Sequence, residues 1–231
     1  MKTEERSARK RLSRRSVLAQ AIELADGEGF DGLSMRSLAA RLDVVPMALY
    51  KHVADKGDLT GGMVDEVIRG YEAPPESLAG WRDRVRFRVM AARNAYLEHP
   101  WLGDAIEGRT RRTEQVFAHM NAVAGEFIDN GLSPDLVHYA MHALGNRIWG
   151  YSREAFPDEA APVPADADDP EIAAYMTDNF PHIVAIALDA AQRNPAGGCE
   201  QEDEFVFALE LLLDGVERLH AAAWESRGLA R

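Results

Sequence analysis

The segment "VVPMALYKHVADK" mixes apolar residues with the polar side chains of Tyr50, Lys51 and His52, and it lies at the basic end of an acidic chain. The formal net charge is -12, yet residues 1–56 carry 11 basic and only 8 acidic side chains, so residues 57–231 hold all of the negative excess. Such an asymmetry is typical of a protein whose N-terminal end alone binds a polyanion. A solvated basic tail without a function would give the same composition, so charge by itself leaves both interpretations open.

Other side chains could bind a metal or catalyse a reaction. Asp135, His138 and His142 lie at i, i+3 and i+7 of one predicted helix, a spacing that can place metal ligands on one face. Two histidines four residues apart on an apolar helix are more often packing or interface residues, and we interpret them so. The sequence has no nucleophile–base motif, glycine-rich phosphate loop or HExxH spacing. We therefore expect no metal, no cofactor and no enzymatic activity.

Cysteine content and hydropathy bear on where the protein works. Cys199 is the only cysteine, which excludes an internal disulfide and favours a reducing compartment. The basic N-terminus is followed by no apolar stretch of a signal peptide, and the longest apolar runs are far shorter than a bilayer requires. We expect a cytoplasmic protein.

The elements that position the N-terminal residues are short helices, and the periodicity of the whole chain is helical. Ser13 is a good N-cap for a first helix, and Ser34 for a second one over Met35–Leu42. A tight connection leads to a third helix, Val45–Val53, with Pro46 at a favourable first position. Two short helices joined by such a turn form a helix-turn-helix, in which the second helix enters the DNA major groove. The predicted fold class is all-α.

The residues themselves make this pattern specific. Over residues 13–68 the sequence resembles the DNA-binding domain of the TetR (tetracycline-repressor) family, through "AIEL", "GFDGLSMRSLAARLDV", "ALYKHV" and "DKGDL". The resemblance implies phosphate contacts by Tyr50, His52 and Lys56, and a guanine contact by Arg36. The full set of DNA-binding residues that we predict is Ser34, Arg36, Val45, Pro46, Met47, Tyr50, Lys51, His52 and Lys56.

Two positions depart from the family pattern. Pro46 stands where the tetracycline repressor has a glutamine, so the operator preference of that protein does not carry over. The tip formed by Val45, Pro46 and Met47 offers only apolar contacts, for instance to a thymine methyl, or depends on DNA shape. Asp43 stands in the turn where many relatives have glycine, and aspartate tolerates the left-handed conformation better than most residues.

We predict three parts: a basic arm (1–12), a helix-turn-helix domain (13–56) and a ligand-binding and dimerisation domain (57–231), with an acidic loop at about 157–169. Resemblance to the tetracycline-repressor branch is looser in the third part. It implies a pocket for a small-molecule effector, and a mostly apolar lining with a few polar groups suits such a pocket. Core packing is the alternative role for each candidate. The candidates are Arg88, Tyr96, Trp101, Ile106, His119, Met141 and Trp149.

The pocket also departs from the founding member. Ile106 replaces the histidine that binds the magnesium of the drug, and Ala92 and Ala122 replace a phenylalanine and a glutamine. We predict that the protein does not bind magnesium-tetracycline in the manner of the tetracycline repressor.

Two apolar helices, at about 134–156 and 203–223, resemble the dimer interface of the family. The sequence thus indicates a homodimer on palindromic DNA, most simply a repressor released by an effector. The alternatives are a helical enzyme and a ligand-binding scaffold without DNA binding; salt-dependent, sequence-selective DNA binding would separate both from a repressor.

Overall fold

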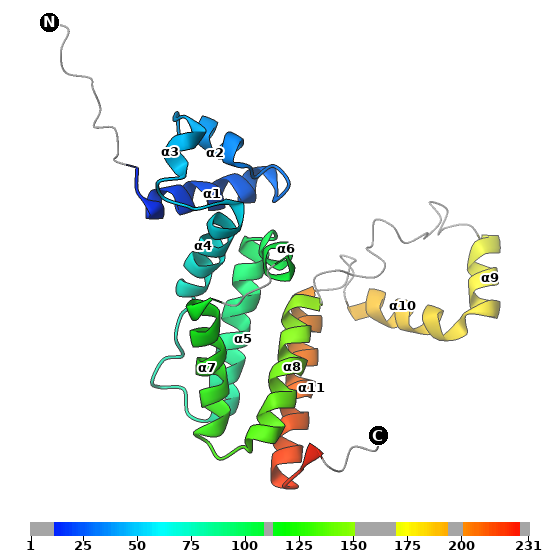
Figure 1. The fold of residues 1–231 in the computed structure, drawn as a ribbon. Coiled ribbons are helices and arrows are strands. Elements are labelled where there is room, and N and C mark those ends of the chain that lie inside the picture. The colour runs from blue at the N-terminus through cyan, green and yellow to red at the C-terminus, as the bar shows by residue number, and fades with distance from the viewer. Residues whose placement is uncertain (1–11, 109–112, 151–169, 194–200, 227–231) are drawn as a thin grey trace, which may run out of the picture.

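In the computed structural model, which describes residues 12–108, 113–150, 170–193 and 201–226, all regular structure is helical, as the sequence predicts. The described helices follow one another in chain order (Figure 1). They are α1 (Arg14–Glu28), α2 (Met35–Arg41), α3 (Pro46–Leu49), α4 (Lys56–Arg69), α5 (Trp81–Glu98), α6 (Leu102–Glu107), α7 (Glu114–Ile128), α8 (Pro134–Gly150), α9 (Pro170–Asn179), α10 (Pro181–Arg193) and α11 (Gln201–Ala221).

The N-terminal helices enclose a first apolar core. Leu24 of α1, Leu38 of α2, Leu49 of α3 and Met63 of α4 are all buried in it. α1 and α4 approach each other closely at Gly62, where a Cβ atom would lie only 2.7 Å from a methyl group of Leu18. Glycine at this position therefore permits the close packing of the two helices, and we call α1–α4 the head.

A second core fills the body of the molecule. α5, α7, α8 and α11 contribute its buried residues, which include Val85, Phe127, Leu136 and Leu209. Figure 1 shows α8 and α11 side by side, with α7 and α5 next to them and the head at one end. Because α4 packs on both α1 and α7, one helix joins the head to the body.

The third helix is shorter than the sequence predicts. α3 ends at Leu49 rather than Val53, because the amides of His52 and Val53 both bond the Leu49 carbonyl in a turn. α5 begins at Trp81. Gly80 precedes it with φ 88°, a left-handed conformation that lies outside a helix.

α9 and α10 form a helical pair that projects from the side of the body (Figure 1). Phe180 separates them, and Pro181 is the first residue of α10. Residues 1–11, most of the basic arm, lie outside the described residues, as do Cys199, residues 151–156 of the predicted interface helix and the acidic loop at 157–169. Among the described helices none is long and apolar enough to cross a membrane.

Candidate nucleic-acid interface

The α2–turn–α3 unit is held by local hydrogen bonds. Ser34 and Ser37 cap α2 reciprocally: the Ser37 amide donates to Ser34 Oγ at 3.0 Å, and the Ser34 amide donates to Ser37 Oγ at 2.9 Å. The turn passes through Asp43 at φ 53°, and the Val44 amide closes it on the Ala39 carbonyl. Leu49 and Val53 are buried against the head core, so α3 is fixed although it is only 4 residues long.

The outer face of this unit carries the residues that the sequence singled out. Val45, Met47 and Tyr50 are 68%, 72% and 47% exposed, large values for apolar and aromatic side chains. Of the nine predicted DNA-binding residues, His52 is half-buried and the other eight are exposed. All nine lie on the α2–α3 unit and the turn into α4, so one ligand surface can engage them together. Their contact with DNA stays a prediction.

Arg14 is a positioning residue that sequence reasoning missed. Its guanidinium donates from Nη1 to the His52 carbonyl at 2.9 Å and pairs with both carboxylate oxygens of Asp58. Asp58 also accepts from the Ala54 amide at 2.8 Å. The end of α3 is thereby tied to α1 and α4. The only sequence signal was an arginine directly after the N-cap of α1, which by itself does not point to a partner 44 residues away.

The Lys56 side chain is restrained by a contact with an aromatic ring. It opens α4, and its ammonium group lies 5.5 Å from the centre of the Phe30 ring. A cation over an aromatic face gains electrostatic stabilisation. Phe30 in turn stacks on Trp101 at 6.5 Å between ring centres. The lysine is therefore held in place while it remains exposed to a ligand.

Trp101, predicted to line an effector pocket, is instead part of the head core. It is buried together with Leu102 and Ala105 of α6, and its indole N–H donates to Asp26 of α1 at 2.6 Å. His99 Nδ1 lies 2.8 Å from the same carboxylate oxygen. The connection between α5 and α6 is thus fastened to the head.

The other pocket candidates are dispersed. Ile106 packs against the head core, and the Tyr96 ring approaches Gly103 of α6. Met141 packs against the body core, and only the backbone of Trp149 is described. Trp101, Ile106 and Met141 thus fill core space between helices in the part of the chain that the structure describes.

Arg88 and His119 belong to a polar cluster between α5 and α7. Glu126 accepts from Arg84 Nε at 2.6 Å and from Arg88 Nε at 2.8 Å. Burial alone would raise the pKa of Glu126, but the hydrogen bonds and charges of the two arginines outweigh it and lower that pKa. This buried carboxylate therefore stays ionised.

His119 packs against a tyrosine. Its ring meets Tyr71 edge-on at 5.0 Å, and burial, with a smaller contribution from Arg88, lowers the pKa of His119 to about 4. Burial raises the pKa of Tyr71 to about 12, and the Tyr71 hydroxyl makes no hydrogen bond within the described residues. Both side chains are therefore neutral at physiological pH.

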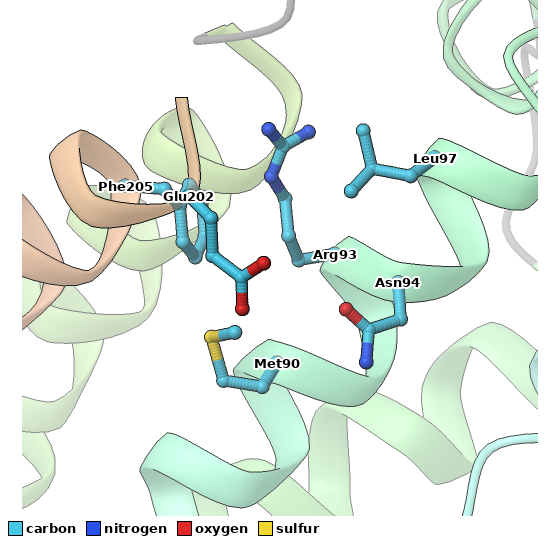
Figure 2. A pocket seen from close by; sticks show the side chains of 6 residues that line it. All are labelled: Met90, Arg93, Asn94, Leu97, Glu202 and Phe205. Atoms are coloured by element: carbon cyan, nitrogen blue, oxygen red, sulfur yellow. The ribbon is translucent and has the colours of Figure 1, made fainter. Parts of the chain in front are cut away.

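Two cavities flank α5. Figure 2 shows the first, where Met90, Arg93 and Asn94 of α5 face Glu202 and Phe205 of α11. Its volume is about 200 Å³, and the Arg93 guanidinium lies 5.0 Å from the centre of the Phe205 ring. The second, of about 590 Å³, lies between α5 and the helices α1 and α4. Neither cavity is lined by any of the seven predicted pocket residues.

Asp135, His138 and His142, the possible metal ligands, make contacts with neighbouring protein groups. The two histidine rings meet edge-on at 4.8 Å, and Asp135 accepts from the Ser226 amide at 2.7 Å. Among the residues that the structure describes, no group of three or more histidine, cysteine or acidic side chains is arranged to hold a metal ion.

Comparisons with known proteins agree with this architecture. A family model described as "Tetracyclin repressor-like, C-terminal domain" matches residues 73–220. The chain is 30% identical to the HTH-type transcriptional repressor DrrR1 of Streptomyces coeruleorubidus over 214 residues, covering 89% of this chain and 77% of that protein. It is 28% identical to the class G tetracycline repressor of Vibrio anguillarum, covering 92% and 97% of the two chains.

Solved structures share the fold. The TetR family protein ActR of Streptomyces coelicolor, in complex with actinorhodin, superimposes with a TM-score of 0.72 at 21% identity, over 93% of this chain and 100% of that one. At this identity the likeness concerns the fold alone.

Proposed function

This chain belongs to the TetR family, and from that premise we propose that it is a homodimeric transcriptional repressor, which binds a palindromic operator and is released by a small-molecule effector. The two relatives described above are transcriptional repressors. We also propose that the protein catalyses no reaction and that it acts in the cytoplasm, where its operator lies. Residues 13–56 would read the DNA, and residues 57–231 would bind the effector and the second subunit.

One observation carries the DNA-binding part: three large apolar or aromatic side chains project into solvent from a helix that is itself pinned to a core. Val45, Met47 and Tyr50 are exposed although apolar and aromatic side chains are ordinarily buried. In a major groove, Val45 and Met47 can pack on thymine methyl groups, and the Tyr50 hydroxyl can donate to a phosphate. Arg36, exposed at the start of α2, can add a two-pronged contact to guanine.

Selection of operator fragments from random duplex DNA by the full-length protein tests this proposal. We expect an enriched palindrome, bound with an affinity that falls steeply as salt rises. Tyr50→Ala should weaken binding about tenfold on every enriched sequence, because a phosphate contact is independent of sequence. Met47→Ala should instead relax the preference at one base pair of each half-site.

Tyr175→Ala is the matched control, because Tyr175 is also an exposed tyrosine and lies on α9, outside the head. Binding without sequence preference, or equal affinities of the Tyr50 and Tyr175 variants, would refute the placement of the recognition helix.

The dimer part is supported by the outer face of the α8–α11 pair. Phe207 and Leu211 are 66% and 54% exposed, and they lie one helical turn apart on α11. Tyr139 of α8 is also exposed. An apolar stripe of this kind on paired helices suits burial against the same stripe of a second copy. Sedimentation should give a dimer for the wild type and a monomer for Leu211→Glu; an unchanged dimer would place the interface elsewhere.

The family premise does not extend to tetracycline. Ile106, at the position of the magnesium-binding histidine, packs against the head core instead of pointing to a metal. We propose that magnesium-tetracycline is not the effector. Stabilisation by micromolar tetracycline that depends on magnesium, measured by thermal shift, would refute this.

A further inference from the structure

The larger cavity is a cleft between the head and the body. α4 and α5 both pack against α7, and the cleft opens between these two helices and the side of α1. Ile22, Val67, Phe87 and Met90 give it an apolar lining. Its volume of about 590 Å³ falls within the range of small-molecule sites, which is roughly 300–1,000 Å³, whereas the cavity at Phe205 is smaller.

The charge of the cleft has one sign. Glu66, Glu72 and Glu98 are among its lining residues, and lysine and arginine are absent from that lining. Glu66 pairs with Arg69. Glu72 and Glu98 are exposed and form no hydrogen bond or ion pair with a described residue. The cleft thus offers two uncompensated carboxylates beside apolar and aromatic surface.

The two carboxylates mark opposite ends of the cleft. Glu98 closes α5 next to His99, which contacts Asp26 of α1, whereas Glu72 follows the C-terminal end of α4. The Asn94 side chain lies between them on α5 and adds a polar group. A ligand with an apolar body and delocalised positive charge would meet an attractive potential along the whole length, and the rings of Phe87 and Tyr71 could add cation–π attraction.

We infer that this head–body cleft is the effector site and that it takes a monovalent organic cation with an apolar body. This rests on the proposed function in one respect, namely that an effector controls DNA binding. The head lines the cleft with Ile22 of α1 and Val67 of α4, and the body lines it with α5, so a bound molecule changes the preferred separation of the two. The ligand then binds the protein more tightly at one head–body separation than at another. Such a difference in ligand affinity is what allows a ligand to control operator affinity.

Tetraphenylphosphonium and tetraphenylborate give a sharp test, because the two ions have nearly the same shape and opposite charge. Isothermal titration of the full-length protein should give saturable binding of one phosphonium per subunit and no saturable binding of the borate. Tetramethylammonium, which has the charge without the apolar body, should bind at least tenfold more weakly than the phosphonium. Equal binding of the phosphonium and the borate would overturn the inference.

Charge-removing variants locate the site. Glu72→Gln combined with Glu98→Gln should weaken phosphonium binding about tenfold, since each exposed ion pair contributes up to about 1 kcal/mol. Glu28→Gln combined with Glu114→Gln removes the same charge from exposed positions outside the cleft and should leave the affinity unchanged. Equal effects of the two double variants would show that the cation responds only to net charge, against the inference.

Operator binding separates this inference from the proposed function. Without ligand, the wild type and both double variants should bind operator DNA equally well; failure of all three would reject the repressor but leave the cation titration interpretable. With ligand, the phosphonium should weaken operator binding by the wild type, and about tenfold more phosphonium should be needed with the Glu72 and Glu98 double variant. Phosphonium binding without any change in operator affinity would show that the cleft is not the effector site.

Discussion

Arg14 and Asp58 form a two-pronged ion pair between the first turns of α1 and α4, with Nη1 to Oδ2 at 2.9 Å and Nη2 to Oδ1 at 2.7 Å. The hydrogen bond from Arg14 lowers the pKa of Asp58, and the same pair raises the pKa of Arg14. Because Arg14 also binds the His52 carbonyl, this pair links the orientation of the recognition helix to both neighbouring helices.

Asp58→Asn should destabilise the head by about 0.5–1 kcal/mol, the upper range for a pair that is partly exposed to solvent. Urea unfolding at pH 7 measures the loss. Asp189→Asn, which breaks the more exposed pair with Arg193 on α10, should cost clearly less. Since the folded-state pKa of Asp58 is lowered, its contribution is complete above the ordinary pKa of 3.8 and disappears as the pH falls below it. If the wild type were still more stable than Asp58→Asn at pH 2, the ion pair would not be the source of the difference in stability.

Substitutions at Asp43 should rank by backbone conformation. The residue has φ 53°, where a Cβ atom is strained and glycine is not. Asp43→Gly should therefore be more stable than Asp43→Ala by about 1 kcal/mol in chemical unfolding. Equal stabilities would mean that the turn adopts another conformation in solution.

Acid should destabilise the protein through His119. Its pKa falls from 6.5 to about 4 in the folded state, so the unfolded chain binds the extra proton between these values. Stability from the neutral ring is complete above about pH 6.5 and is lost as the pH falls toward 4, by up to about 3 kcal/mol. His119→Gln should remove this part of the pH dependence. Parallel stability curves for wild type and variant between pH 7 and 4 would show that the ring is not buried in its neutral form.

Removal of the Glu126 carboxylate should be costly. Its side chain is 9% exposed and pairs with Arg84 and Arg88, of which Arg88 is itself 17% exposed. Glu126→Ala leaves these guanidinium groups without their acceptor and should destabilise the body by about 2–3 kcal/mol. Glu210→Ala, in the more exposed network with Arg82 and Arg86, should cost under about 1 kcal/mol. Similar losses of stability for Glu126→Ala and Glu210→Ala would show that burial does not make the Glu126 ion pairs more important than those of Glu210.

Local signals explain what could be predicted. Ser34 as an N-cap, Pro46 at a first helical position and Gly131 at φ 87° after α7 are decided by neighbouring backbone groups, so their positions follow from sequence. The exposure of Met47 and Tyr50 follows from the same register, because Leu49 and Val53 occupy the buried side.

Pocket residues were harder to predict because they depend on distant partners. Trp101 is a residue type that often lines pockets. Its indole N–H instead donates to Asp26, 75 positions earlier, which holds the side chain in the head. Arg88 likewise meets Glu126, and the cleft at Glu72 and Glu98 arises from three helices that no sequence window contains.

The sequence by itself determined the all-helical class, the helix-turn-helix with its exposed apolar tip and the membership in a regulator family, because capping, periodicity and motif are properties of short segments. Only the tertiary structure decided which residues join head to body and where a ligand-sized space remains. Those features depend on contacts between helices far apart in the chain, such as Trp101 with Asp26, and on the volume that packed side chains leave unfilled.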